Sequence, residues 1–538
     1  MRHHLLLAAT LLLVAPLLAL DGQPGIHDPS TVIVENGRYY TFGTGGGIPI
    51  LASDDGWTWR RLGSVADGVK GGLPSENVLT RGGRNTWAPD IIKSGDRYFL
   101  YYSAPATQPR AAIGLLVGRT LDPTSPDYGW EDGGPVVWSD GVEDSNAIDP
   151  GLFRDPTDGR LWMVYGSYFG YIRQVELDPK TGTRLHPNRE PVNVAINSEA
   201  SIMIHHEGWY YLLVTHGSCC AGASSTYNIR MGRSRRVTGP FLDNMGIDML
   251  QGGGKLFQGS HGRFIGPGHF GLLDLGDGVQ KFSLHYEADL DRGGISVLDL
   301  RPLLWRDGWP VAGENFAEGT YQLESARTGT ALELAVEGTP VGGPRGRGAR
   351  GGFGGAAGRG AGPGGRGAGP GPGGAATPPL APAPAQQAPP PAPATPPPPP
   401  APILAQTAAQ VSTNWPAGGV DVRLSPYMTQ AQQKWQVTPV AAAGGYPGSP
   451  FFKITIAGTD RALAATAAGE VHAVATFSGA PEQLWRIDQL ADGSYRVMPK
   501  AMPDGSAPLA LSAVGSSKPT LTRFRTDSDR ERWLFKTP

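Results

Sequence analysis

Cysteine is almost absent from this chain of 538 residues, which has only two, the adjacent Cys219 and Cys220. A disulfide framework needs cysteines that are separated in the sequence, so packing has to hold the fold together. Two neighbouring cysteines can close a vicinal disulfide or remain two small thiols, and the sequence leaves both open. The net charge is also small, −2 at pH 7, which argues against nucleic-acid binding through overall charge.

Long apolar runs are equally scarce. The one clear run lies near the N-terminus, where Arg2 is followed by an apolar stretch over 5–19 and then by Asp21. A basic start, a short apolar core and small residues near its end are typical of a secretory signal peptide, here 1–20, and not of a membrane anchor. We therefore expect a secreted protein, extracellular or periplasmic, with no membrane partner.

What the sequence does contain is a repeated aromatic and β-branched pattern that predicts strands, with no convincing amphipathic helix between the copies. The copies lie about 50 to 70 residues apart, the length of a four-stranded propeller blade with its loops. The fold class is therefore all-β, and we expect a five-bladed β-propeller over 21–316, with a β-sandwich as the alternative. The five copies are 38–42, 97–103, 161–165, 209–214 and 281–286.

Residues 338–408 differ abruptly from the rest because Gly, Pro and Ala dominate them. Arg/Gly repeats come first, and a polyproline run over 396–400 follows. Such a segment cannot bury a core, so we expect a disordered insertion. Its arginines could attract anionic pectin, but a solvated linker is the first interpretation.

A second repeat lies toward the C-terminus. Trp435, Trp485 and Trp533 stand 50 and 48 residues apart, each two residues after a Gln or Glu. The strand that opens the first copy, at Tyr321, precedes the Gly/Pro-rich insertion, so we infer a threefold domain over 317–538 whose first lobe carries it. These Gln-x-Trp repeats resemble the ricin-type β-trefoil. The resemblance implies a lectin-like fold, whereas the Asp and aromatic residue that sugar binding needs in each lobe are not apparent, and Glu531 replaces Gln in the third copy.

Three acids head three of the predicted blades. Asp28, Asp149 and Glu199 each lie about 10 to 12 residues before a different aromatic strand, and equivalent positions on successive blades point toward the central channel. Cleaving a glycosidic bond needs one carboxylate that activates water and one carboxylic acid that protonates the leaving oxygen. Pro29 fixes the backbone beside Asp28, which suits the base, and the small and apolar neighbours of Glu199 would raise its pKa, which suits the acid.

The motifs around these acids, taken in order, resemble glycoside hydrolase family 43, and specifically its arabinanases. The resemblance implies a secreted inverting hydrolase of α-1,5-linked L-arabinan, with endo action as the first expectation. An exo-acting arabinofuranosidase or β-xylosidase of the same family and a non-catalytic sugar-binding propeller are the alternatives. The matching segments are His27-Asp28-Pro29, Trp87-Ala88-Pro89-Asp90, Asn146-Ala147-Ile148-Asp149-Pro150, Ser198-Glu199-Ala200, 225–234 and Gly266-Pro267-Gly268-His269.

Carried over position by position, the resemblance makes Asp28 the general base, Glu199 the general acid and Asp149 the modulator of the acid's pKa. It also implies that the channel histidine His269 contacts a Ca²⁺ ion held otherwise largely by water. The partner would be the polysaccharide itself, arabinan of pectin, and we expect a monomer. The sugar subsites would be lined by Trp87, Ala112, Asn146, Ala147, Ile148, Gly166, Ser167 and Tyr168.

Another motif points elsewhere. Arg154-Asp155-Pro156 mimics the Arg-Asp-Pro motif of retaining fructan hydrolases, which share the five-bladed propeller. Those enzymes combine it with an Asn-Asp-Pro nucleophile and a Glu-Cys acid, whereas this chain has His-Asp-Pro and Glu-Ala. The inverting interpretation is therefore favoured, and Asp155 is set aside.

Overall fold

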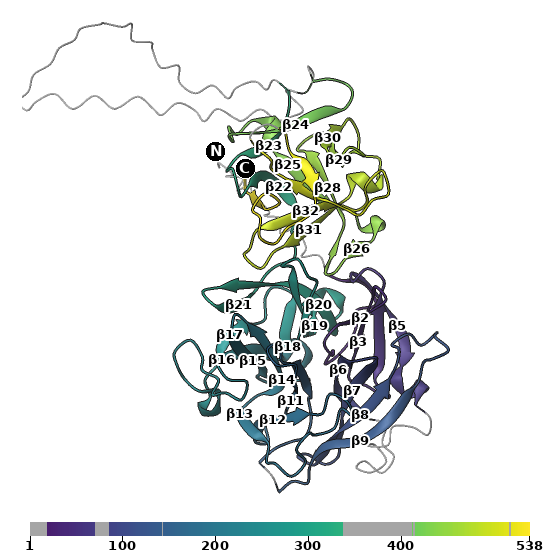
Figure 1. Ribbon diagram of the computed structural model, residues 1–538, viewed down its shortest axis with the longest axis vertical. Coiled ribbons are helices and arrows are strands. Elements are labelled where there is room, and N and C mark those ends of the chain that lie inside the picture. Colours follow the sequence, from purple (N-terminus) through teal and green to yellow (C-terminus); the bar gives the residue numbers. More distant parts are fainter. Residues whose placement is uncertain (1–18, 70–84, 143, 337–411, 413–414, 516–517) are drawn as a thin grey trace, which may run out of the picture. The chain divides into compact units, whose positions relative to one another are not determined.

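The computed structural model describes residues 19–69, 85–142, 144–336, 412, 415–515 and 518–538 (Figure 1). The expected insertion over 338–408, and all of the expected signal peptide except residues 19 and 20, lie outside these described residues. Within the described residues every regular element is a strand or a short 3-10 helix. No helix among them is long and apolar enough to cross a membrane.

Five sheets follow one another along the chain and form the blades of a β-propeller, which confirms the predicted architecture (Figure 1). The first sheet has the order β1-β5-β4-β3-β2, with β1 parallel to β5, and the other four each run through four consecutive antiparallel strands. The first blade contains β1 (Asp21–Gly22), β2 (Ile33–Glu35), β3 (Arg38–Phe42), β4 (Pro49–Ser53) and β5 (Thr58–Ser64), followed by the 3-10 helix η1 (Val65–Gly68).

The second and third blades are regular four-stranded sheets. The second contains β6 (Trp87–Ser94), β7 (Arg97–Pro105), β8 (Ala111–Gly118) and β9 (Trp130–Ser139). The third contains β10 (Gly151–Arg154), β11 (Leu161–Tyr165), β12 (Tyr171–Leu177) and β13 (Val192–Ile196).

The fourth and fifth blades carry short 3-10 helices in their loops. The fourth contains β14 (Glu199–His206), β15 (Trp209–His216), η2 (Gly222–Ser224), β16 (Asn228–Ser234), η3 (Met249–Gln251) and β17 (Lys255–Gln258). The fifth contains β18 (Phe264–Asp274), β19 (Gln280–Asp289), η4 (Leu290–Arg292), β20 (Ile295–Arg306) and β21 (Trp309–Ala312).

Apolar side chains between neighbouring blades close the ring. Each predicted aromatic run lies in the strand that pairs with the end strand β2, β6, β10, β14 or β18 of its sheet, namely β3, β7, β11, β15 or β19. Successive side chains of a strand point to opposite faces, so Tyr98 joins a buried cluster with Tyr40 of the first blade, and Phe99 joins one with Met163 of the third. Comparable clusters fill the other three gaps, including the one between the fifth and first blades. Packing therefore holds the propeller, as the scarcity of cysteine requires.

A residue with left-handed backbone stands at the same point of every blade, where the chain enters the channel. The φ angles are +47° for Asp28, +33° for Ala88, +57° for Asp149, +47° for Ala200 and +56° for His269. Such values are uncommon outside glycine and cost free energy, and they cluster at functional sites. Three of these five positions are predicted site residues.

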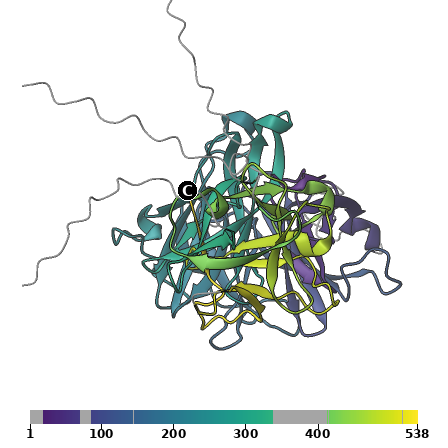
Figure 2. The same ribbon diagram turned by 90° about the horizontal axis from the view of Figure 1, so that it is seen from above.

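The C-terminal part of the chain is a second β-rich region, and Figure 2 shows its strands beyond residue 415 from above in green to yellow. Strands β22 and β23 precede the segment 337–411 and β24 follows it, yet β23 pairs with β24 and β22 with β25. The strands are β22 (Gly319–Ser325), β23 (Ala331–Leu334), β24 (Val420–Ser425), β25 (Trp435–Pro439), β26 (Gly445–Tyr446), β27 (Ser449–Pro450), β28 (Phe452–Ile456), β29 (Ala462–Ala465), β30 (Val471–Val474), β31 (Trp485–Gln489), β32 (Tyr495–Pro499), β33 (Ala510–Ser512), β34 (Thr520–Thr522) and β35 (Trp533–Lys536). The 3-10 helices are η6 (Ala431–Gln433), η7 (Ala441–Ala443) and η8 (Pro481–Gln483).

The three repeated tryptophans make the same contact in this region. Each is fully buried at the start of its strand, β25, β31 or β35. The indole N–H groups of Trp435, Trp485 and Trp533 donate to the backbone oxygens of the second strand in each repeat, at 2.8, 2.9 and 2.8 Å. The acceptors are Leu332, Leu463 and Leu511.

Candidate active site

A cavity of about 260 Å³ brings the three predicted acids together. Asp28 lies in the loop before β2, Asp149 shortly before β10, and Glu199 is the first residue of β14, so three blades contribute. All three are buried. The cavity is also lined by His27, Thr44, Trp87, Ile148, Cys219, Cys220, Tyr227 and His269.

Donor groups surround the carboxylate of Asp28. Its Oδ2 accepts a hydrogen bond from the Thr44 hydroxyl at 2.5 Å and lies 2.8 Å from Nδ1 of His27. Its Oδ1 lies 3.3 Å from Nε2 of His269. Burial by itself would raise the pKa of Asp28, but the neighbouring histidines outweigh burial and hold the pKa well below its usual range. Asp28 is therefore ionised at neutral pH.

His27 lies between two carboxylates. Its Nδ1 faces Asp28, and its Nε2 lies 3.1 Å from Oε1 of Glu287 in β19. Burial opposes protonation, but the hydrogen bonds to Asp28 and Glu287 raise the pKa of His27 to about 11. Burial lowers the pKa of both His269 and His285. His269 and His27 both lower the pKa of Asp28, and of the two only His27 has a raised pKa, so His27 carries the positive charge at neutral pH.

Glu199 accepts hydrogen bonds from neutral hydroxyls and not from histidines. Its Oε1 accepts a short hydrogen bond from the Tyr227 hydroxyl, and its Oε2 accepts one from the Ser167 hydroxyl at 2.8 Å. Burial raises the pKa of Glu199, the negative charges of Asp28 and Glu287 add to the rise, and the two hydrogen bonds only partly oppose it. Glu199 can therefore keep a proton at a pH where Asp28 has none.

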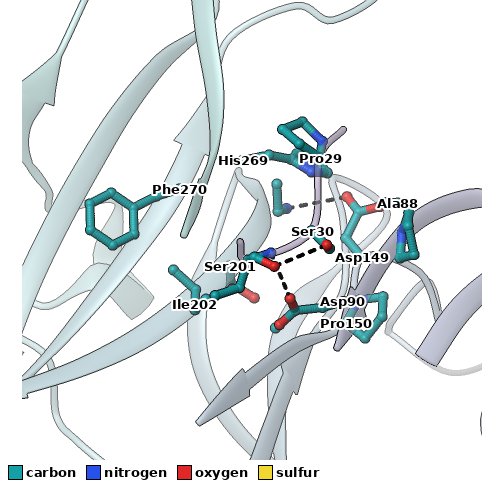
Figure 3. Close-up of a pocket in the computed structure, with 14 residues that line it drawn as sticks. Pro29, Ser30, Ala88, Asp90, Asp149, Pro150, Ser201, Ile202, His269 and Phe270 are labelled. Atoms are coloured by element: carbon teal, nitrogen blue, oxygen red, sulfur yellow. Dashed lines mark hydrogen bonds between the residues drawn. The ribbon is translucent and has the colours of Figure 1, made fainter. Parts of the chain in front are cut away.

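Asp149 connects the third and fourth blades. Its backbone N–H donates to the Ser103 hydroxyl oxygen at 2.9 Å, and its Oδ2 accepts from the Ala200 amide at 3.2 Å, the dashed line that reaches Asp149 in Figure 3. Burial raises the pKa of Asp149 well above its usual value, and the charges of Glu199 and Asp28 raise it further. Asp149 and Glu199 therefore titrate as a coupled pair.

An adjoining cavity of about 500 Å³ contains most of the predicted sugar-binding residues. Asn146, Ile148, Ser167 and Tyr168 line it, and Trp87 lines both cavities. Both polar side-chain atoms of Asn146 are buried and have no hydrogen-bond partner among the described residues. Buried amides are normally paired, so this one is free to bind a ligand.

Three of the predicted sugar-binding residues lie outside the lining of both cavities. Ala112 in β8 and Ala147 are fully buried, and Ala147 belongs to the cluster between the second and third blades. Gly166 donates its amide to the Ile148 oxygen at 2.9 Å. A Cβ at Gly166 would lie 2.6 Å from the backbone oxygen of Tyr171, so this position tolerates only glycine. Gly166 and Ala147 therefore support the wall behind Ile148.

His269 lies where a metal ion could be held. Burial lowers its pKa, so the imidazole is neutral and able to act as a ligand. Calcium takes six to eight oxygen ligands, and the only carboxylate oxygen close to a ring nitrogen of His269 among the described residues is Oδ1 of Asp28, at 3.3 Å. The donor set therefore fits a calcium ion only if water supplies most of its ligands. A group with closer spacing is His27, Asp28 and His285, whose ligating atoms lie within 4.8 Å of one another.

The cysteines and the second acidic motif have different surroundings. Cys219 and Cys220 are free thiols that line the cavity. The structure therefore has two thiols here and not a vicinal disulfide. Asp155 lies outside both cavities, where it accepts a hydrogen bond from the Tyr210 hydroxyl at 2.9 Å and thereby joins the third blade to the fourth.

Several residues of the site were not expected from the sequence. His285 lies in the fifth aromatic run and Glu287 directly follows that run, both in β19, which the sequence marks only as a strand. Their partners, His27 and the Asp28 amide, are 260 and 257 residues away in the chain. Thr44, on the loop after β3, also has no motif of its own. The available signal was a histidine and a glutamate two residues apart, His285 and Glu287.

Comparison with known proteins agrees with this geometry. Residues 23–310 match the family described as Glycosyl hydrolases family 43. An extracellular exo-α-(1→5)-L-arabinofuranosidase of Cellvibrio japonicus is 36% identical over 334 residues, covering 58% of this chain and 93% of the relative. The extracellular endo-α-(1→5)-L-arabinanase 1 of Bacillus subtilis is 33% identical over 296 residues, covering 53% of this chain and 87% of the relative.

Solved structures give the same relationship. The α-L-arabinanase of Cellvibrio cellulosa complexed with arabinohexaose matches with a TM-score of 0.50 and 32% identity, covering 54% of this chain and 95% of that one. The residues that match the family, 23–310, span more than half of the sequence and include strands of all five blades. This chain belongs to family 43 of the glycosyl hydrolases.

Proposed function

We propose that this protein is a secreted, inverting hydrolase of α-1,5-linked L-arabinan. The observation that carries the proposal is the opposite pKa direction of two carboxyl groups in one cavity, lowered for Asp28 and raised for Glu199. A base and an acid on either side of one bond need such a separation. The names of the relatives from Cellvibrio japonicus and Bacillus subtilis support arabinan as the substrate and an extracellular location.

In the proposed reaction Asp28 takes a proton from water while the water oxygen attacks the anomeric carbon. Glu199 donates its proton to the glycosidic oxygen as that bond breaks, so one bond forms and one breaks in a single displacement. His27 keeps Asp28 ionised and oriented through Nδ1. We assign Asp149 the modulation of the acid, because the charge of Glu199 raises the pKa of Asp149 and the two carboxyl groups therefore titrate together.

The sugar would bind across the two adjoining cavities. The unpaired amide of Asn146 offers both a donor and an acceptor to sugar hydroxyls. Trp87 lies beside both cavities and offers an aromatic face for a sugar ring. Tyr168 is held by its hydroxyl, which donates to the Gly217 oxygen at 2.7 Å.

Endo action is our first choice because the cavity lined by Asn146 and Tyr168 extends beyond the acids and offers room for more than one sugar. Exo action is the second candidate, since one close relative is named as an exo-enzyme. Incubation with linear arabinan and sizing of the products tests this choice. Oligosaccharides early in the reaction support endo action, and monosaccharide alone contradicts it. Full activity of Glu199→Ala on every substrate would contradict the assigned acid.

We also propose that His269 binds calcium together with water. The ion, when bound, would supply positive charge that favours the ionised form of nearby carboxylates. The role of His269 itself is to present a neutral ring nitrogen, which burial and its lowered pKa support.

For the C-terminal region we propose a β-trefoil that carries the Gly/Pro-rich insertion in its first lobe. The three equivalent Trp-to-backbone bonds and the pairing of β23 with β24 across that segment support it. Whether it binds sugar is tested by measuring retention of the intact protein on insoluble arabinan after Glu199→Gln has removed hydrolysis.

A further inference from the structure

Asp90 is a buried carboxylate of the channel that the proposed reaction does not use. It lies in β6 of the second blade and is 4% exposed. With Asp149 and His269 it lines a small cavity at the centre of the propeller (Figure 3). No lysine, arginine or histidine among the described residues forms an ion pair with it, so charge neutralisation does not explain its burial.

The two oxygens of Asp90 accept hydrogen bonds from two other blades. Oδ1 accepts from the backbone N–H of Thr31 at 2.9 Å, and Oδ2 accepts from that of Leu152 at 2.8 Å. Thr31 follows Asp28 by three residues, and Leu152 follows Asp149 by three residues. A single carboxylate of the second blade thus holds the first and third blades at equivalent points, each next to a proposed site acid.

The backbone segments between these hydrogen bonds and the acids are short and conformationally restricted. Pro29 and Pro150 directly follow the two acids, and proline fixes its own φ. A Cβ at Gly151 would lie 1.9 Å from the Ser201 oxygen, so this strand is pressed against the fourth blade. A shift of either amide would therefore reach the acid that precedes it.

We propose that Asp90 is a positioning residue that sets the placement of Asp28 relative to Asp149 by accepting hydrogen bonds from both of their strands. The inference rests on the proposed roles of those two acids. Asparagine cannot replace Asp90, because it has one acceptor oxygen and its NH₂ group would face a backbone N–H. The strand of either Asp28 or Asp149 would then lose its hydrogen bond to residue 90. A displacement of a catalytic group by about 1 Å can lower the rate about 100-fold.

The test compares Asp90→Asn with Asp155→Asn at neutral pH, above the pKa of about 6 to which burial raises Asp90. Asp155 is a matched control because it is also buried and joins two blades, through Tyr210, but lines neither substrate cavity. We expect D90N to lower kcat on linear arabinan about 10- to 100-fold while KM stays within about twofold. D155N should lose thermal stability and keep kcat.

A second measurement needs no substrate. Carboxyl ¹³C NMR measures the apparent pKa values of the Asp149–Glu199 pair. These values should shift in D90N and stay unchanged in D155N. Folded D90N with wild-type kcat and an unmoved titration would overturn the inference. If D90N is too unstable, D90E keeps the charge and both acceptors but displaces them, and it should lower kcat in the same way. Wild-type protein without arabinan hydrolysis contradicts the proposed function, and the NMR titration then still decides the role of Asp90.

Discussion

Nδ1 of His27 lies 2.8 Å from Oδ2 of Asp28, the carboxylate proposed to activate water. The opposite ring nitrogen contacts Glu287, so the ring is held at both ends. A protonated imidazole beside the buried carboxylate of Asp28 stabilises the ionised form of that carboxylate. The base is thus kept free of a proton by its own neighbour in the sequence.

Replacing His27 by glutamine should move the acidic limb of the kcat/KM profile to higher pH. Glutamine carries no charge, so the pKa of Asp28 returns toward its ordinary value, and protonation of the base inactivates the protein at a pH that wild type tolerates. His186→Gln is the control, because His186 is exposed and its ring lies 3.9 Å from the carboxylate of Glu176. An acidic limb unchanged by H27Q would contradict the role of His27.

The same substitution makes a prediction for stability. The folded-state pKa of His27 is raised from 6.5 to about 11. Its contribution is therefore complete below pH 6.5 and is lost as pH rises through the folded-state value. The difference in Tm between wild type and H27Q should be larger at about pH 6 than at about pH 10. A difference that grows with pH would have the wrong sign.

Tyr227→Phe should move the alkaline limb of the profile to higher pH. The Tyr227 hydroxyl donates to Glu199 and favours its charged form. Without this bond the pKa of Glu199 rises, and the acid keeps its proton to a higher pH. Tyr210→Phe removes a comparable buried hydroxyl that donates to Asp155 outside the cavities, and it should leave the limb in place. A downward shift in Y227F would contradict the account.

Trp485→Phe should destabilise the C-terminal region without changing kcat on soluble substrate. The change removes the indole donor to the Leu463 oxygen, and leaving that buried acceptor unpaired costs about 1 to 3 kcal/mol. Calorimetric unfolding measures the loss. If the three repeats are equivalent, W435F and W533F lose a similar amount, and one variant of wild-type stability would disprove the equivalence.

Removal of calcium should lower both Tm and activity. A ligand that binds only the folded state stabilises it, so chelation followed by added Ca²⁺ should lower and then restore Tm. His269→Ala should show no response to the added ion. Equal Tm values with chelator and with calcium would contradict a bound ion, whatever the activity does.

The strands and blade order could be predicted from the sequence because they depend on local patterns. Each aromatic run forms a strand next to the end strand of its blade, and the acids lie ahead of these runs as expected. The contacts that tune those acids could not be predicted in this way. Glu287 reaches His27 across 260 residues, and Asp90 reaches Leu152 across 62, through ring closure that no local pattern encodes.

The predicted sugar-binding residues divide along the same line. Side chains of Asn146 and Tyr168 face the adjoining cavity, whereas Ala112 and Ala147 are fully buried. A motif locates the segment that approaches the substrate. Which of its side chains point outward depends on the left-handed turn at Asp149 and on the packing of Ala147 between two blades.

The central claim is that Asp28 and Glu199 act on opposite sides of one glycosidic bond in a single displacement. Proton NMR of the first product formed from linear α-1,5-arabinan tests it most directly. We predict that the new reducing end appears first as the β-anomer and then mutarotates, and that Asp28→Asn and Glu199→Gln both abolish its appearance. An α-anomer as the first product would show retention and contradict the proposed roles.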